Sequence, residues 1–222
     1  DAPEQIITDS KDGIIDAKKI ERGFVIWPLI PYHFSTVDTL DVPAPSPPDN
    51  NHLLGTDDTA RDVLARVIYG FRLSILFALF VSIFSSFIGI FMGAVQGYFG
   101  GRTDFLGQRL IEIWGATPLI YLIIIVAAIY RMDFWLLVFL MILFSWTALV
   151  GVVRAEFLRA RNFEYVQAAK ALGVSPIKIM IRHVLPNAMV ATLTMLPFIV
   201  KGAIGSLAAL DFLGFGLPSS AP

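Results

Sequence analysis

The chain has 222 residues, of which 56% are hydrophobic and 16% charged, and it has a net charge of −1 and a mean hydropathy of +0.70. Soluble domains carry roughly 25% charged residues, so this composition argues against a water-soluble enzyme and favours a bilayer protein. Residues 1–71 hold six Lys/Arg against twelve Asp/Glu, whereas residues 72–222 hold eleven against six. We therefore expect an outer segment, 1–71, and a membrane domain, 72–222, in different surroundings.

Two stretches of the outer segment have a recognisable pattern. Residues 42–48 contain four prolines, whose fixed φ angles favour an extended, polyproline-like run. We interpret this run as a stiff spacer, with a plain surface linker as the alternative. An apolar stripe at helical spacing then predicts an amphipathic helix at the outer interface of the membrane, and it consists of Val63, Leu64, Val67 and Ile68.

Four apolar stretches are long enough to cross the hydrocarbon core, which needs roughly 20 residues of helix. They run from Leu73 to Gly101, from Ile113 to Tyr130, from Phe134 to Val153 and from about Asn187 to Leu210. Six basic and two acidic residues lie between the third and the fourth stretch. Because basic loops stay in the cytoplasm, the outer segment is expected in the periplasm of a bacterial inner membrane. The sequence thus predicts an all-α polytopic membrane protein.

Small residues recur every four positions in the first span, at Ser85, Gly89, Gly93 and Gly97. Such a face lets helix backbones approach closely in lipid, so we expect this span to pack inside a bundle. In the second span, Arg109 and Glu112 stand three residues apart, close enough for a local ion pair.

Two residues inside the spans are candidates for a translocation path. Pro118 interrupts the second span, and the expected kink either widens a path or is an ordinary feature of a bundle. Lys201 is the one charge deep within a span, and intramembrane charges usually face a partner or a wet cavity. Alternatively, the backbone freedom at Gly202 and Gly205 lets the Lys201 stem reach the interface.

No catalytic or metal-binding constellation stands out. The chain has no cysteine, and His33, His52 and His183 are far apart in the sequence. Glu112 and Asp211 fall on opposite sides of the membrane in the expected topology, so they cannot form an acid–base pair. We expect no cofactor or metal in this chain, and any ATP that drives it must be bound by another chain.

The cytoplasmic loop 154–186 carries the strongest pattern. Residues 162–172 are typical of a helix that ends at Gly173, a favoured terminator. One stripe of this helix suits docking into a groove of a soluble partner, and it consists of Tyr165, Val166, Ala169 and Leu172. A plain amphipathic helix at the interface is the alternative.

A second short helix is expected to follow in the same loop. Ser175 and Pro176 cap residues 177–184, and Pro186 is expected to stop the helix. The result is a helix-turn-helix elbow, and because membrane spans tether both its ends, it does not read nucleic acid.

The loop resembles the Glu-Ala-Ala signature of membrane permease subunits of ATP-binding cassette importers. The spacing of the signature is intact, but Gln167 stands for the usual Glu and His183 for the usual Ile. The resemblance implies an ATPase-coupling elbow made of Glu164, Tyr165, Gln167, Ala168, Ala169, Leu172, Gly173, His183, Leu185 and Pro186.

Two further motifs resemble the dipeptide/oligopeptide branch of these importers. The periplasmic motif before the first span has Ala60 where the branch usually has Gly, and it contains Gly55, Thr56, Asp57, Arg61 and Asp62. The other motif, at residues 210–218, has Asp211 in place of the usual Ser. With the proline-rich run and the acidic outer segment, the chain is most similar to the Yej-type permease, the C-like inner-membrane subunit of importers for microcin C and oligopeptides.

This resemblance implies a type I importer permease bundle with six spans in the full protein, four of them in this chain. It implies as partners a homologous second permease, two cassette ATPase domains that bind ATP and Mg, a periplasmic substrate-binding protein, an oligopeptide substrate and the lipid bilayer. Because the chain starts at Asp1 with neither Met nor a signal-peptide pattern, we expect one span before it and one after it.

Three other functions stay open at the level of sequence. A permease of the same branch for dipeptides, nickel or another small solute is the leading alternative, because none of these motifs contacts the substrate. A membrane-embedded enzyme of lipid or peptidoglycan handling would need a polar cluster within one leaflet. A scaffold subunit would not need an elbow with preserved spacing.

Overall fold

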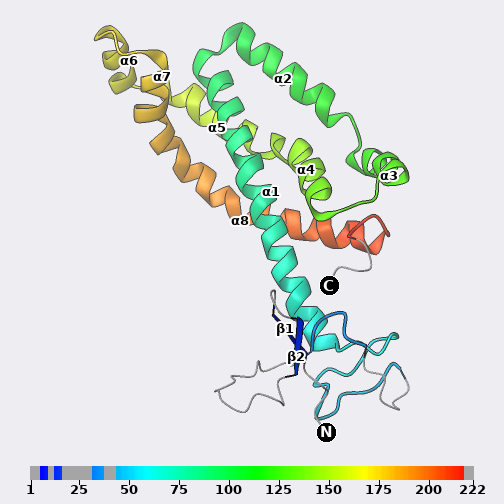
Figure 1. The fold of residues 1–222 in the computed structure, drawn as a ribbon. Coiled ribbons are helices and arrows are strands. Elements are labelled where there is room, and N and C mark those ends of the chain that lie inside the picture. The colour runs from blue at the N-terminus through cyan, green and yellow to red at the C-terminus, as the bar shows by residue number, and fades with distance from the viewer. Residues whose placement is uncertain (1–5, 10–12, 17–31, 38–43, 218–222) are drawn as a thin grey trace, which may run out of the picture. The chain divides into compact units, whose positions relative to one another are not determined.

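The computed structural model describes residues 6–9, 13–16, 32–37 and 44–217, and the chain divides into two compact units, residues 1–70 and 71–221. In the first unit, strands β1 (Ile6–Asp9) and β2 (Gly13–Asp16) form an antiparallel hairpin in which Ile7 pairs with Ile15 (Figure 1). The sequence analysis missed this hairpin, although Asp-Gly between two isoleucine-rich runs is typical of one.

The proline-rich run is folded onto the rest of the first unit where it is described. Ser46 is buried, its main-chain N–H donates to Thr56 Oγ1 at 3.0 Å, and the N–H of Thr56 donates to the Ser46 carbonyl at 3.2 Å. Residues 44–48 are therefore no free spacer, while Val42 and Pro43 lie outside the described residues.

Helix α1 (Val63–Phe99) begins directly after Asp62, whose Oδ1 accepts a 2.6 Å hydrogen bond from the N–H of Ala65. This bond caps the helix, because the side chain satisfies an N–H that has no partner within the helix. The prediction of a separate interfacial helix was wrong. Residues 63–68 are the first turns of α1, since nothing between Ile68 and Leu73 breaks the helix.

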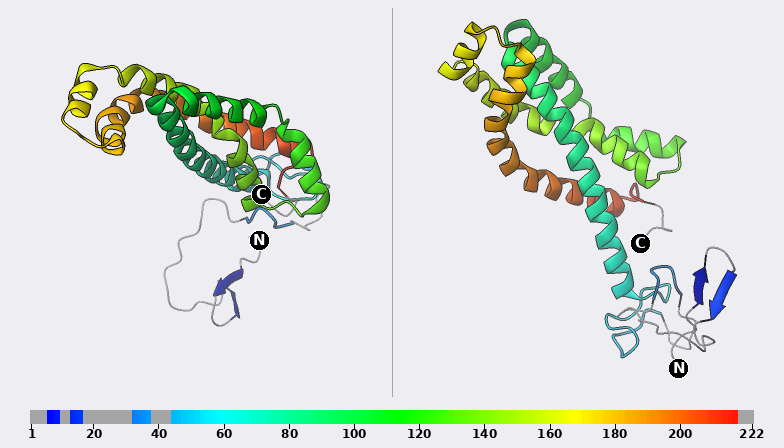
Figure 2. Two further views of the ribbon diagram at one scale, coloured as in Figure 1. Left: turned by 90° about the horizontal axis from the view of Figure 1, so that it is seen from above. Right: turned by 60° about the vertical axis from the view of Figure 1, so that its left-hand side comes forward.

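The second unit is helical throughout its named elements (Figures 1 and 2). After α1 come α2 (Gly101–Gly115), α3 (Leu119–Ile129), α4 (Phe134–Ser145), α5 (Thr147–Ala160), α6 (Glu164–Ala171), α7 (Pro176–Ile179), the π-helical turn η2 (Met180–Val184) and α8 (Leu185–Phe212).

Among the described residues, three helical stretches are long and apolar enough to span a membrane: Val63–Phe99, Phe134–Ala160 and Pro176–Phe212. Helices α2 and α3 are bent by 59° and add a fourth span if the pair is counted as one. The predicted second span is therefore not one straight helix. It is broken at residues 116–118, and Pro118 caps α3, which confirms that this proline interrupts the span.

The expected stop at Pro186 was wrong. The chain passes from α7 through η2 into α8, and Pro186 lies in the first turn of α8. A proline is tolerated in a first helical turn, where its missing N–H is not needed, and the wider π turn supplies the local irregularity before it.

The stripe of small residues in α1 packs as the sequence predicted. A Cβ atom on Gly89 would lie 2.5 Å from the carbonyl oxygen of Trp146, and one on Gly97 would lie 2.5 Å from that of Arg154. Gly93 meets Val150 and Val153 in the same way. The stripe thus allows α1 to contact the backbone of α5 and of Trp146, which precedes it.

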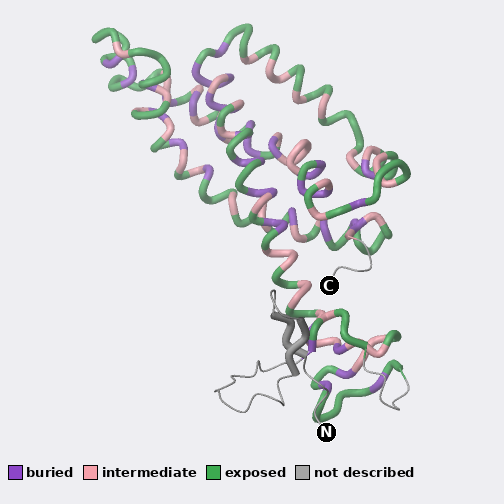
Figure 3. The backbone as a smooth tube through the Cα atoms, viewed as in Figure 1, coloured by how far each residue is buried: buried purple, intermediate pink, exposed green. Residues whose placement is uncertain are grey.

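Two hydrophobic clusters form the core of the second unit, and their buried residues appear in purple in Figure 3. One cluster joins α1 to α3, α4 and the end of α8, with Phe77 and Leu137 fully buried. The other joins α1 to α5, α6, α7 and the start of α8, with Phe157 and Ile179 fully buried. The second cluster is the base on which the predicted elbow rests.

Candidate functional site

The predicted elbow is formed by α6, α7 and η2, so residues 154–160 and 185–186 at the ends of the predicted loop belong to α5 and α8. Helix α6 ends as predicted. Gly173 has φ +74°, its N–H donates to the Lys170 carbonyl, and the N–H of Val174 donates to the Ala169 carbonyl. These two bonds form a Schellman motif, which needs a residue in the left-handed region at the position of Gly173.

The predicted docking stripe is divided between two faces of α6. Val166 and Ala169 are buried in the cluster that α1, α5 and α7 share, whereas Tyr165 and Leu172 are exposed. The stripe as a whole therefore does not face a partner. Its two small residues fasten α6 to the bundle, because the base of the elbow has its own apolar core to complete.

Gln167 and Ala168 are both exposed on α6. The Gln167 side-chain amide donates a 2.9 Å hydrogen bond to the carbonyl of Arg161, at the end of α5. A glutamate at this position has no N–H to donate, so Gln167 makes a contact that the usual residue of the signature could not make.

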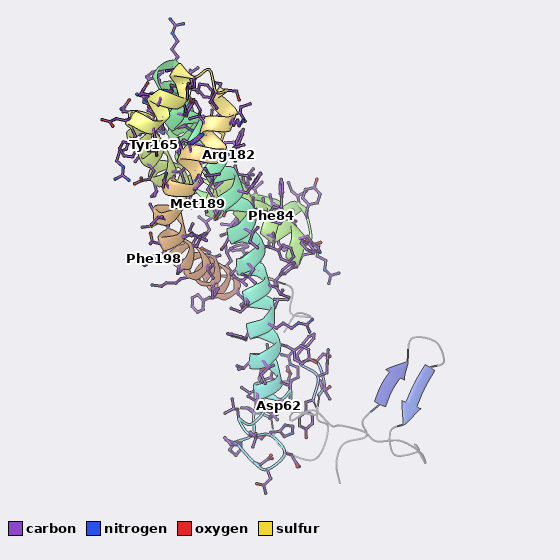
Figure 4. All side chains as sticks on the ribbon, turned by 90° about the vertical axis from the view of Figure 1, so that its left-hand side faces the viewer. Asp62, Phe84, Tyr165, Arg182, Met189 and Phe198 are labelled. Carbon is purple, nitrogen blue, oxygen red and sulfur yellow. The ribbon has the colours of Figure 1, made fainter. Side chains whose placement is uncertain are left out.

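The two halves of the elbow are tied together through Asn187. Its Nδ2 lies 3.2 Å from the Tyr165 hydroxyl and 3.0 Å from the His183 carbonyl, so the start of α8 is linked to α6 and to η2. His183 and Leu185 are half-buried, and Pro186 is exposed. Tyr165 and Arg182 both lie at the elbow (Figure 4).

The outward face of the elbow combines exposed apolar side chains with charge. Leu172 is 83% exposed, the largest share among the apolar elbow residues, and Glu164, Lys170, Lys178 and Arg182 surround it on α6, α7 and η2. An exposed leucine on a rigid, charged projection is suited to insertion into a groove of another protein.

A wholly apolar cavity of about 670 Å³ lies beside the base of the elbow, between α1 and the stretch from α7 to α8. Ile177 and Ile181 line it, together with Phe91, Phe157 and Met189. The exposure of these two isoleucines is therefore directed into this cavity. Leu172 does not line the cavity, and its side chain is available to a partner.

The two candidates for a translocation path occupy different places. Pro118 lies at the break between α2 and α3, while Lys201 is exposed on α8, next to the exposed Gly202 and Gly205. Among the described residues, no side chain forms a hydrogen bond or ion pair with the Lys201 ammonium. Helix α8 also bends along its length and contains Pro197 (Figure 1).

In the first unit, Asp57 organises the motif before the first span. Its Oδ1 accepts hydrogen bonds from the N–H of Thr59 at 2.9 Å, the Thr59 hydroxyl at 2.7 Å and the N–H of Arg61 at 3.0 Å. Its Oδ2 accepts from Arg61 Nε at 2.9 Å and from Arg66 Nη1 at 2.5 Å. Burial by itself raises the pKa of Asp57, but the bonds from Arg61 and Thr59 outweigh it and hold the pKa well below its ordinary value.

Asp62 joins this motif to the start of α1. It is buried, its Oδ2 lies 2.8 Å from His52 Nδ1, and the ring of His52 stacks on that of Tyr32 with centroids 4.7 Å apart. Gly55 accepts a 3.1 Å hydrogen bond from the N–H of Val63. The five motif residues thus share one network. Ala60 adopts φ +56°, a conformation that glycine adopts without strain and that explains the glycine usual at this position.

The sequence analysis missed a second set of polar contacts. Arg154 on α5 forms a bidentate ion pair with Asp104 on α2, in which Nη2 lies 2.6 Å from Oδ2. Gln108 Nε2 donates to Gln96 Oε1 at 2.8 Å. The predicted pair of Arg109 and Glu112 is present but exposed. In the described part of the chain, no group of three acidic or histidine residues could hold a metal ion.

Comparison with known proteins connects this architecture to a family. Residues 85–222 match the family described as the binding-protein-dependent transport system inner membrane component. The chain is 50% identical to the peptidoglycan transport system permease protein YejE of Agrobacterium fabrum, over 97% of the chain and 63% of the relative.

Two further relatives are similar over most of the chain. The inner membrane ABC transporter permease protein YejE of Escherichia coli is 49% identical, over 96% of the chain and 63% of the relative. The oligopeptide transport system permease protein OppC of Bacillus subtilis is 32% identical, over 85% of the chain and 61% of the relative. The chain thus spans less than two thirds of the length of these relatives.

Proposed function

Because this chain belongs to the family of binding-protein-dependent transport system inner membrane components and is a multi-pass protein of that family, we propose that it is the permease subunit of an ATP-binding cassette importer for oligopeptides. The proposal includes peptides of the microcin C class. The observation that carries it is the similarity of about half of all residues to the two YejE permeases, together with the 32% identity to an oligopeptide permease.

The elbow is the part of this chain that would receive the driving force. In the proposal, two cassette ATPase domains bind ATP and Mg, and each permease inserts its elbow into one of them. Leu172 and Ala168 lie on the outward face, and the Schellman turn at Gly173 fixes the angle between α6 and α7. ATP binding by the partner chains then moves the elbow, and the permease pair changes between inward-open and outward-open states.

The topology that goes with this proposal places the elbow in the cytoplasm and residues 1–71 in the periplasm. The network around Asp57 and Asp62 then holds the start of α1 at the periplasmic surface, where a substrate-binding protein delivers its cargo. A second, homologous permease would complete the path, and Lys201 and Pro118 are its proposed contributions from this chain.

Two other cargo classes have specific support. The name of the Agrobacterium fabrum relative specifies peptidoglycan transport, and the dipeptide transport system permease protein DppC of Bacillus subtilis is 32% identical over 77% of the chain. Oligopeptides, dipeptides and peptidoglycan fragments are all peptide-containing solutes, so one permease architecture can serve them while the substrate-binding protein selects among them.

The deciding experiment uses the full-length protein, reconstituted in liposomes with its neighbouring permease, the cassette ATPases and the binding protein. We expect ATP hydrolysis to rise when the binding protein is loaded with an oligopeptide, and radiolabelled peptide to accumulate in the lumen. Stimulation by dipeptides or peptidoglycan fragments alone would replace the cargo assignment. Failure of any cassette ATPase to bind the permease would overturn the importer assignment itself.

A further inference from the structure

Helix α2 is attached to the second unit in an unusual way. None of its residues is buried, and none belongs to either hydrophobic cluster among the described residues. Its better-covered positions recur at helical spacing and are largely polar or small, at Asp104, Gly107, Gln108, Ile111 and Trp114. Its large apolar side chains are exposed, at Phe105, Leu106, Leu110 and Ile113. Polar contacts, rather than an apolar core, therefore position this helix.

Three such contacts run along α2, each to a different helix. Asp104 pairs with Arg154 of α5, Gln108 accepts the company of Gln96 of α1 through its 2.8 Å hydrogen bond, and Trp114 Nε1 donates to the Leu143 carbonyl of α4 at 2.8 Å. The pair with α5 is the strongest of the three, because both partners are charged and the guanidinium offers two N–H groups to two carboxylate oxygens.

Arg154 lies on the helix that leads directly into the elbow. Its side chain is 29% exposed and that of Asp104 is 17% exposed, so water screens this pair less than an exposed surface pair. Two turns later, the Arg161 guanidinium fills the space that a Cβ on Gly100 would need, just before α2 begins. The start of α2 is thus held at two points by residues that precede α6.

We propose that Asp104 and Arg154 fix α2 to the root of the elbow, so that α2 moves as one body with α5 and α6 during the transport cycle. This inference rests on the proposed importer function. Asp104 and Arg154 are positioning residues in it, because they act through the elbow and not on the cargo.

The two chain breaks that lie beyond this body meet at one atom. Trp114, just before the break at residues 116–118, and Trp146, at the break between α4 and α5, both donate an indole N–H to the Leu143 carbonyl, at 2.8 and 2.9 Å. Movement of α2 and α5 against α3 and α4 would therefore be taken up around Leu143.

The first test measures distance in the assembled full-length complex. Spin labels at Leu106→Cys on α2 and Ala155→Cys on α5 occupy exposed positions outside the ion pair, and the 222-residue chain has no cysteine of its own. We expect the same label-to-label distance without nucleotide and with ATP bound, and a changed or broadened distance in the Asp104→Asn background. A distance that differs between the two nucleotide states of the otherwise unchanged complex overturns the proposal.

The second test measures coupling. Asp104→Asn should lower the number of molecules imported per ATP by about tenfold, since a charged hydrogen-bonded contact is lost, and Asp104→Glu should restore part of it. Glu112→Gln is the matched control, because it removes a carboxylate of the same helix whose ion pair is 55% exposed and local. Equal ratios in Asp104→Asn and Glu112→Gln would overturn the proposal.

The two tests separate this inference from the importer assignment. If Asp104→Asn does not assemble, the distance in the unchanged complex still decides. If no solute stimulates ATP hydrolysis in the unchanged complex, the proposed function fails, whereas the distance measurement needs only nucleotide binding by the partner chains.

Discussion

The side-chain amide of Gln167 on α6 donates a 2.9 Å hydrogen bond to the main-chain carbonyl of Arg161, which ends α5. The bond spans the short turn between the two helices and satisfies a carbonyl that has no partner within α5. It therefore sets how the elbow leaves the bundle, together with the burial of Val166 and Ala169 on the other side of α6.

Removing this donor should loosen α6. Gln167→Met keeps the length of the side chain and its helix propensity but donates no hydrogen bond, so we expect a loss of about 0.5–1.5 kcal/mol in the local stability of α6. Hydrogen exchange of the α6 amides in micelles measures this loss. Asn162→Ala, which removes a longer bond of 3.4 Å to the Leu158 carbonyl, is the control and should have a smaller effect.

The turn at Gly173 should tolerate side chains according to conformation and not size. A Cβ at Gly173 meets no atom within 4 Å, but the φ of +74° costs a β-branched residue about 1–2 kcal/mol. Gly173→Val should therefore uncouple ATP hydrolysis from uptake, whereas Gly173→Asn should transport nearly normally. Normal uptake per ATP in Gly173→Val would contradict the coupling role of the elbow.

The contact between α1 and α5 should not tolerate one added methyl group. In Gly97→Ala the new Cβ would lie 2.5 Å from the Arg154 carbonyl oxygen and 2.6 Å from Phe157 Cβ, so backbone must move. We expect the free energy of unfolding in mixed micelles to fall by about 1–3 kcal/mol. Gly151→Ala, also on a helix but in open space, should be neutral or slightly stabilising.

The network around Asp57 should fail in acid. The folded pKa of Asp57 is lowered, so its contribution to stability is complete above the unfolded pKa of about 3.9 and is lost as the pH falls toward the folded pKa. Below about pH 4, protection of the Thr59 and Arg61 amides from hydrogen exchange, corrected for intrinsic rates, should fall about tenfold per pH unit. Asp57→Asn should abolish this dependence, and Asp58→Asn, which makes none of these bonds, should leave it unchanged.

The charge of Lys201 should matter to transport more than to assembly. Lys201→Met removes an exposed ammonium that no described side chain pairs with, so the assembled complex should form in normal amounts while uptake falls several-fold. Lys201→Arg keeps the charge and should retain most of the uptake. A loss of assembly with normal uptake per assembled complex would show that Lys201 is needed for packing instead.

The failed sequence predictions share a cause. The sequence analysis ended a helix at Pro186 and placed a separate helix at residues 63–68, and both mistakes treat a local pattern as an element boundary. Whether a proline stops a helix depends on what precedes it, here the π turn at Met180–Val184. The apolar stripe from Val63 is read correctly as helical, but its continuity with the first span depends on the absence of a break, which a stripe does not report.

The sequence by itself determined the spans, the end of α6 at Gly173 and the close-packing face of α1, because hydrophobicity, backbone conformation and side-chain size act on neighbouring residues along the chain. Only the tertiary structure decided what each face meets. It buried Val166 and Ala169 against α1 and α5, and it joined Asp104 to Arg154 across 50 residues. Such pairings depend on how the helices cross in space, and periodicity along one helix carries no information about the partner on another.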